Sequence, residues 1–259
     1  MTGSEGRVAG EIALAAISHG TSSPLGQSAV ASLVDAVALA LGDVPVRGGF
    51  VDVQQPDVEA TLDSLPQGTS TVVVPLLLSA GYHVHVDLTR TLASESRDCV
   101  LADALGPDRR LVDLLIARLL TLGLRASDRI VLACAGSSDD RAVEDCLEMG
   151  RMLGASLGAP VRVGFLSAAG PSVAEAVQQE RLAYPCSRVI VSTYLLAPGY
   201  FADLAAASQA DLVSPPLLTA HEPPDASIIE VVLERYRSGR LRLERTGAST
   251  DPGVPLGLA

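Results

Sequence analysis

The two halves of this sequence repeat each other. The segment DRIVLACAGSSD at 128–139 repeats EIALAAISHGTSS at 11–23, and VRVGFLSAAGPSVAEAV at 161–177 repeats VRGGFVDVQQPDVEATL at 46–62. The offset between matching glycines and prolines stays between 115 and 118 residues along the whole repeat. A repeat unit of this length is far longer than the unit of a solenoid, so the sequence predicts two similar lobes.

Within each half, short apolar runs alternate with segments of helical periodicity. In the first half the predicted strands lie within 11–20, 44–52, 70–81 and 96–106, and the predicted helices include 26–42, 55–66 and 107–123. Strands that alternate with helices, and that are apolar on both faces, are typical of a parallel sheet covered on both sides. The predicted fold class is therefore α/β, with two similar lobes, each a mostly parallel sheet with helices on both faces.

The repeat also predicts the domain limits. We expect a first lobe at 1–124, a second lobe at 125–237 and a disordered tail at 238–259, since the tail contains Gly, Pro and Ser without periodicity.

Composition excludes several classes of function. The net charge of −11 disfavours nucleic acid as a partner. No run of 18 apolar residues, no secretory signal and no CxxC pair occurs, so we expect a reduced, cytoplasmic protein that does not cross a membrane. Neither GxGxxG nor a P-loop follows any predicted strand, so no nucleotide site is expected, and the absence of GxSxG disfavours a serine hydrolase.

Comparing the halves separates residues that shape the backbone from residues that carry chemistry. The turn residues Gly20, Gly81 and Tyr82 correspond to Gly136, Gly199 and Tyr200. The chemically active residues are not kept: His19, Asp52 and His83 correspond to Ala135, Ser167 and Phe201. All three candidate functional groups therefore belong to the first half.

His19, Asp52 and His83 each follow a predicted parallel strand, and ligands of open α/β sheets bind outside those strand ends. Two imidazoles and a carboxylate suit a divalent ion such as Fe(II), Co(II) or Ni(II), and the same groups can accept protons. A histidine at a strand end can also be a solvated or capping residue, and His85 can lie on the surface.

With these residues in hand, the chain resembles the sirohydrochlorin chelatase family, the class II tetrapyrrole metal chelatases. The motifs that carry the resemblance are SHGTSSP at 18–24, FVDVQQPDVEATL at 50–62 and VVVPLLLSAGYHVHVDL at 72–88. The two-lobe arrangement resembles the long bacterial form, in which one lobe holds the active site and the other is degenerate.

The resemblance implies insertion of Fe(II) or Co(II) into sirohydrochlorin or a closely related tetrapyrrole, with the metal as substrate and without a nucleotide. His19 and His83 would bind metal and accept pyrrole protons, and Asp52 stands where the family usually has Glu. His85, where Arg is common, is a candidate third metal ligand. We expect the turns at Gly20, Gly81 and Tyr82 to contact the substrate, and a monomer is favoured.

A non-catalytic tetrapyrrole or metal carrier would need the same pocket and stays open as an alternative. A methyltransferase or reductase would need a nucleotide-cofactor loop, which the sequence lacks.

Overall fold

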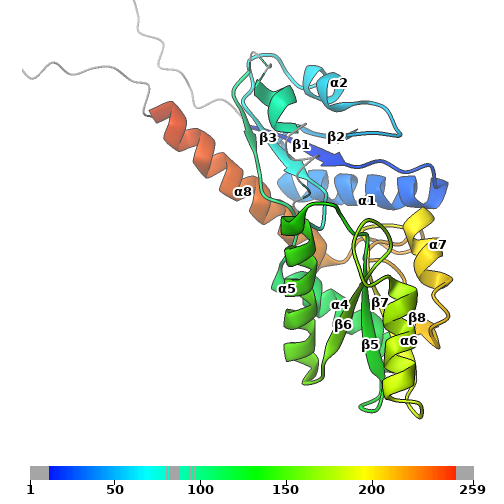
Figure 1. Cartoon of the computed structure of the whole chain (residues 1–259). Coiled ribbons are helices and arrows are strands. Elements are labelled where there is room, and N and C mark those ends of the chain that lie inside the picture. Colours follow the sequence, from blue (N-terminus) through cyan, green and yellow to red (C-terminus); the bar gives the residue numbers. More distant parts are fainter. Residues whose placement is uncertain (1–11, 80, 82–87, 94, 96, 249–259) are drawn as a thin grey trace, which may run out of the picture.

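Two parallel four-stranded sheets form the framework of the protein (Figure 1). The computed structural model describes residues 12–79, 81, 88–93, 95 and 97–248. The first sheet has the order β2-β1-β3-β4 and the second β6-β5-β7-β8, so the two halves share one topology, and the predicted fold class is confirmed. The strands of the first sheet are β1 (Ala13–Ser18), β2 (Val46–Phe50), β3 (Thr71–Pro75) and β4 (Cys99–Leu101). Those of the second are β5 (Arg129–Cys134), β6 (Val161–Phe165), β7 (Val189–Tyr194) and β8 (Leu212–Val213).

Strand register brings the carboxyl ends of the three main strands of each lobe to one level. In the first sheet Ser18 pairs with Phe50, and Ile17 pairs with Pro75. In the second sheet Cys134 pairs with both Phe165 and Tyr194. The loops that follow these strands therefore meet at one edge of each sheet.

The helices cover the sheets in the expected βα alternation. They are α1 (Pro24–Leu41), α2 (Val58–Asp63), α4 (Arg109–Thr121), α5 (Asp140–Leu157), α6 (Val173–Ala183), α7 (Tyr200–Ala206) and α8 (Ala226–Ala248). Equivalent helices begin with equivalent caps. The Ser23 hydroxyl accepts the Gly26 N–H at the start of α1, and the Asp139 carboxylate accepts the Arg141 N–H at the start of α5.

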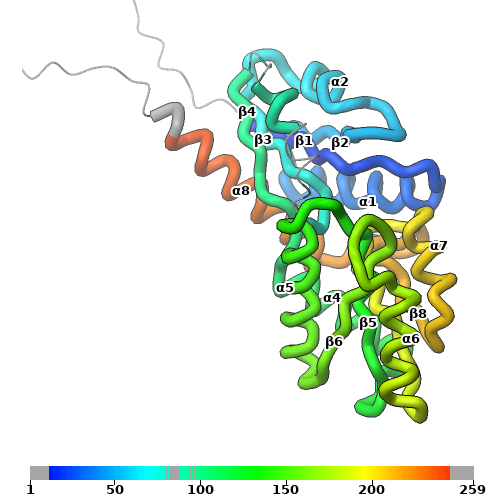
Figure 2. Tube along the Cα trace, viewed as in Figure 1, coloured from blue at the N-terminus to red at the C-terminus, as the bar shows by residue number. Residues whose placement is uncertain are grey.

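The last helix of each half packs on the other half. Helix α4 follows β4 in the chain but contacts β7 and α5 of the second lobe. Helix α8 follows β8 but contacts β3, β4 and α1 of the first lobe. Figure 2 shows α8 beside the first lobe. The sequence limits of the halves at 124 and 125 therefore do not coincide with the spatial lobes, because these two helices are exchanged.

The exchange corrects the expectation of a disordered tail from 238. Helix α8 continues to Ala248, because the first sheet needs a cover that α4 does not provide. Gly239 lies directly on this sheet, where a Cβ atom would lie against the side chains of Val72 and Val100. Residues 249–259 lie outside the described part of the chain.

The inner faces of both sheets share one hydrophobic core. Its buried members come from both lobes and from both exchanged helices, and they include Leu14, Leu33, Leu115, Leu132, Val232 and Tyr194. Two smaller clusters, one on the outer face of each sheet, stay within a single lobe. The two lobes are therefore joined by apolar packing rather than by a surface contact.

Helix α1 is the one described helix whose length and composition would allow it to cross a membrane. A core helix passes the same test, and α1 buries Ala29, Leu33 and Val37 while contacting β2 and α8.

Candidate active site

A cavity of about 560 Å³ lies between the lobes at the carboxyl ends of their strands. The loops after β1 and β3 line one side, and the loops after β5 and β7 line the other. In each lobe the first strand lies between the second and the third, so the crevice outside the first and third strands is the topological switch point where α/β proteins bind ligands. The duplication brings two such switch points together around one cavity.

His19 is exposed at the end of β1 and lines this cavity. Its carbonyl oxygen accepts the Asp52 N–H at 3.0 Å, which ties the loop after β1 to the loop after β2. Gly20 follows with φ of +97°, and a Cβ there would collide with the Asp52 carbonyl oxygen. The glycine is thus required by the close approach of the loops that position His19.

The second lobe has the same backbone without the histidine. Gly136 has φ of +90°, and a Cβ there would collide with the Ser167 carbonyl oxygen. Ala135, which corresponds to His19, presents only a methyl group to the cavity, and its carbonyl oxygen accepts the Ser167 hydroxyl at 2.9 Å. The shared loop geometry therefore carries an imidazole in only one lobe.

Asp52 is exposed, and its carboxylate accepts the Val53 N–H at 2.7 Å. It is not among the described residues that line the cavity. Gln54 lines it instead, with its side-chain oxygen accepting the Thr21 N–H at 2.9 Å. Sequence reasoning missed Gln54, and a polar amide two residues beyond the predicted carboxylate was the available signal. The role of Asp52 stays a prediction.

The other predicted site residues come from the loop after β3. Gly81 lines the cavity, close to Ser137 of the second lobe. Tyr82, His83 and His85 lie outside the described residues, so their roles stay predictions. Within the described part of the chain, no three His, Cys, Asp or Glu side chains form a group able to hold a metal ion.

The second lobe contributes a largely apolar wall that sequence reasoning did not anticipate. Residues 194–202 line the cavity, and Tyr200 and Phe201 at the start of α7 are exposed. Beneath them, the hydroxyl of Tyr194 donates to the Leu78 carbonyl oxygen at 2.9 Å across the lobes. Burial raises the pKa of Tyr194 well above its ordinary value, so this phenol stays a neutral donor.

Two buried cysteines lie next to the cavity, and Cys146 contributes to its lining. Burial raises the pKa of Cys134 well above its ordinary value. A hydrogen bond with Cys134 lowers the pKa of Cys146. Both are free thiols.

Charge is nearly absent from the described lining, which contains neither Arg nor Asp nor Glu. Arg47 and Arg90, which lie next to the site motifs in the sequence, are not part of it. Arg47 instead donates to the Val46 carbonyl oxygen on β2. The described cavity is therefore suited to an apolar or conjugated group with His19 at its edge.

Two parallel sheets that exchange their last helices and face each other across this cavity define a two-lobed protein with the chelatase-like fold. The chain belongs to the CbiX family, whose model matches residues 13–122 and again residues 129–237. The family assignment made from the sequence is confirmed, and the double match follows the internal repeat.

Relatives in this family are named for metal insertion. The chain is 26% identical to a sirohydrochlorin cobaltochelatase of Methanosarcina barkeri over 122 residues, which is 42% of this chain and 94% of that protein. It is 36% identical to a sirohydrochlorin cobaltochelatase of Sulfolobus acidocaldarius over 74 residues, which is 27% of this chain and 60% of that protein. The archaeal relatives are thus matched over less than half of this two-lobed chain.

Solved structures share the whole fold. SirB from Bacillus subtilis with Fe3+ matches with a TM-score of 0.74 at 21% identity, covering 91% of this chain and 98% of that one. The sirohydrochlorin chelatase SirB from Bacillus subtilis subspecies spizizenii, in complex with cobalt, matches with a TM-score of 0.67 at 17% identity, covering 91% and 97%. The likeness therefore covers both lobes.

Proposed function

We propose that this protein is a metal chelatase that inserts Fe(II) or Co(II) into sirohydrochlorin or a closely related tetrapyrrole. Membership of the CbiX family supports this activity, as do the names of the archaeal relatives. The metal ion is a substrate, and no nucleotide is needed.

The observation that carries the proposal is the position of His19. It stands at the edge of an apolar cavity outside β1 and β3, while the matching loop of the second lobe carries Ala135. A neutral imidazole can bind a divalent ion or accept a proton. Metal insertion needs both a metal ligand and a proton acceptor, because the ring loses two N–H protons as the ion enters.

His83 is proposed as the second imidazole, and His85 as a further metal ligand. Asp52 is proposed either to orient one of the histidines or to add an oxygen ligand to the metal. Gly20, Gly81 and Tyr82 are proposed to shape the turns that contact the macrocycle. One chain already encloses the cavity, which supports a monomeric enzyme, and its free thiols suit the cytoplasm.

The test is an anaerobic assay that follows sirohydrochlorin absorbance with Fe(II), Co(II) and Ni(II). His19→Ala and His83→Ala should each lower the rate of metal insertion by roughly 100-fold or more, the scale expected for loss of an essential proton-transfer or ligand group. His221→Ala is the matched control, because this exposed histidine lies in a second-lobe loop away from the cavity. A double variant that metallates as fast as the parent would refute the assignment of the histidines.

The same assay separates an enzyme from a carrier. Many equivalents of metallated product per protein support catalysis, whereas product that stops at one equivalent supports the non-catalytic carrier instead.

A further inference from the structure

The cavity gathers a large share of the aromatic residues of this chain. The sequence contains only five Tyr, three Phe and no Trp. Tyr194, Tyr200 and Phe201, all from the second lobe, line the cavity. Tyr194 is buried and serves the contact between the lobes, whereas Tyr200 is 71% exposed and Phe201 is 37% exposed.

The exposed pair does not contribute to the core. On α7 it is Ala205 that is buried, while the rings of Tyr200 and Phe201 lie 5.7 Å apart at an interplanar angle of 52°. Large apolar side chains exposed together at a concave site usually mark a surface that a ligand covers. Val53 of the first lobe, 58% exposed, adds a further apolar group to the lining.

The surrounding lining identifies what kind of ligand would cover these rings. It offers no arginine among the described residues, although sirohydrochlorin carries eight carboxylates. The part of such a ligand that fits this lining is its flat conjugated ring, since aromatic side chains pack against ring faces in offset or tilted arrangements. The carboxylates would then point to the mouth of the cavity and to water.

We infer that Tyr200 and Phe201 form a stacking platform for one face of the tetrapyrrole ring, and that this platform binds the substrate in the cavity beside His19. The inference rests on the proposed function. In the internal repeat Phe201 occupies the position that His83 has in the first half. At this position of the repeat, the second lobe would therefore bind the ring through Phe201, and the first lobe would bind metal through His83.

The experiment measures binding of metal-free sirohydrochlorin by fluorescence titration, and then the kinetics of cobalt insertion, for Tyr200→Ala, Phe201→Ala and the double variant. Each single variant should weaken binding about tenfold, and the double variant about a hundredfold, with the loss in KM rather than in kcat. Phe201→Tyr and Tyr200→Phe keep a ring and should restore binding to within about twofold of the parent. Tyr184→Ala is the control, since this second-lobe tyrosine is 43% exposed and lies outside the cavity lining.

The salt dependence of sirohydrochlorin binding tests whether the carboxylates of the substrate face water. If the carboxylates face water, raising KCl from about 50 mM to about 500 mM should leave the affinity unchanged or increase it, because salt screens the repulsion between an acidic protein and a polyanion. A loss of affinity of more than about tenfold would indicate arginine pairing and overturn the orientation.

Different outcomes refute the platform and the proposed function. If the parent binds and metallates sirohydrochlorin but the double alanine variant binds it equally tightly, the platform is refuted and the proposed function stands. If the parent neither binds nor metallates sirohydrochlorin, the proposed function and the platform fall together.

Discussion

At the scale of single residues, the two lobes show how one loop geometry can serve two purposes. His19 and Ala135 follow equivalent strands and precede equivalent left-handed glycines, Gly20 and Gly136. The backbone of the loop is fixed by the close approach of the neighbouring loop, so the side chain before the glycine is free to differ. The side chain at this one position therefore decides whether the loop after the first strand of a lobe carries an imidazole or a methyl group.

Gly26 shows the same dependence on close approach, here between the lobes. It lies in the first turn of α1, and a Cβ there would collide with the Pro198 carbonyl oxygen of the second lobe. Helix propensity alone predicts that Gly26→Ala stabilises the protein by about 1 kcal/mol. The collision of the new Cβ with the Pro198 carbonyl predicts a loss of stability of about 1–3 kcal/mol. We expect this loss to exceed the gain in helix propensity, because a backbone group cannot easily move aside.

Urea denaturation of Gly26→Ala measures the balance. Ser28→Ala, at an exposed position of the same helix, is the control and should gain a few tenths of a kcal/mol. A Gly26→Ala protein as stable as this control would mean that the lobes do not approach each other this closely at Pro198.

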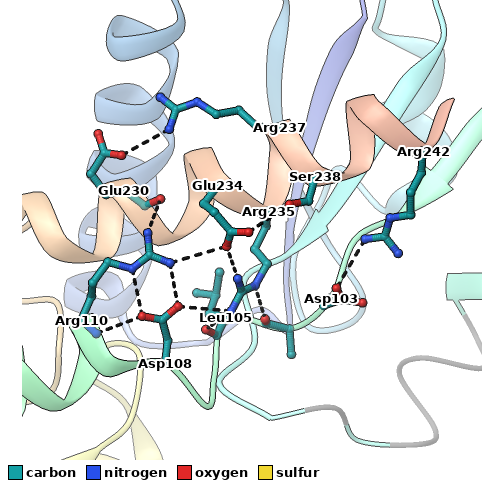
Figure 3. A network of polar contacts seen from close by, with 11 residues as sticks. Asp103, Leu105, Asp108, Arg110, Glu230, Glu234, Arg235, Arg237, Ser238 and Arg242 are labelled. Atoms are coloured by element: carbon teal, nitrogen blue, oxygen red, sulfur yellow. Dashed lines mark hydrogen bonds and ion pairs between the residues drawn. The ribbon is translucent and has the colours of Figure 1, made fainter. Parts of the chain in front are cut away.

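At the scale of elements, a polar network fastens α8 to the segment between β4 and α4 (Figure 3). The Arg235 guanidinium donates to the carbonyl oxygens of Ala104 at 2.7 Å and Leu105 at 3.0 Å, and it is paired with Asp108 and Glu234. Asp108 also caps α4 by accepting the Arg110 N–H at 2.9 Å. Burial opposes ionisation of Asp108, but hydrogen bonds from Arg110 outweigh it and hold the pKa of this carboxyl below its usual range.

Removal of Arg235 should therefore loosen the exchanged helix. Arg235→Ala leaves two backbone carbonyls and a carboxylate without this donor, and we expect a loss of about 2–4 kcal/mol in the free energy of unfolding. Arg237→Ala, two residues along, removes a side chain that is 59% exposed and paired with Glu230, and should cost less than about 0.5 kcal/mol. Chemical denaturation of both variants makes the comparison, and equal stabilities would contradict a fastening role for the network.

At the scale of the whole molecule, the exchanged helices and the shared core make the lobes interdependent. Helix α8 covers the first sheet, and α4 covers the second. One apolar core includes residues of both lobes and both helices. Each half of the sequence therefore lacks the helix that would complete its own hydrophobic face.

A chain cut between 124 and 125 tests this interdependence. We expect the fragments 1–124 and 125–259, expressed separately, to lack cooperative unfolding, because each exposes the sheet face that the other half's helix covers. Mixed, they should assemble one to one and regain native circular dichroism and cobalt insertion. Two fragments that each unfold cooperatively on their own would show that the halves are independent domains.

Periodicity and strand-end motifs are local properties of the chain, so they were enough to predict the repeat, the strand and helix order, and the residues that follow β1 and β2. The sequence also indicated the family, because each motif that carries the resemblance, such as SHGTSSP, is an unbroken stretch of the chain. The exchange of α4 and α8 was decided only in the tertiary structure, because an apolar helix face does not specify which of two similar sheets it will cover. The same holds for the aromatic wall of Tyr200 and Phe201: the second lobe lacks the histidines, but only its packing against the first lobe places its rings in a common cavity with His19.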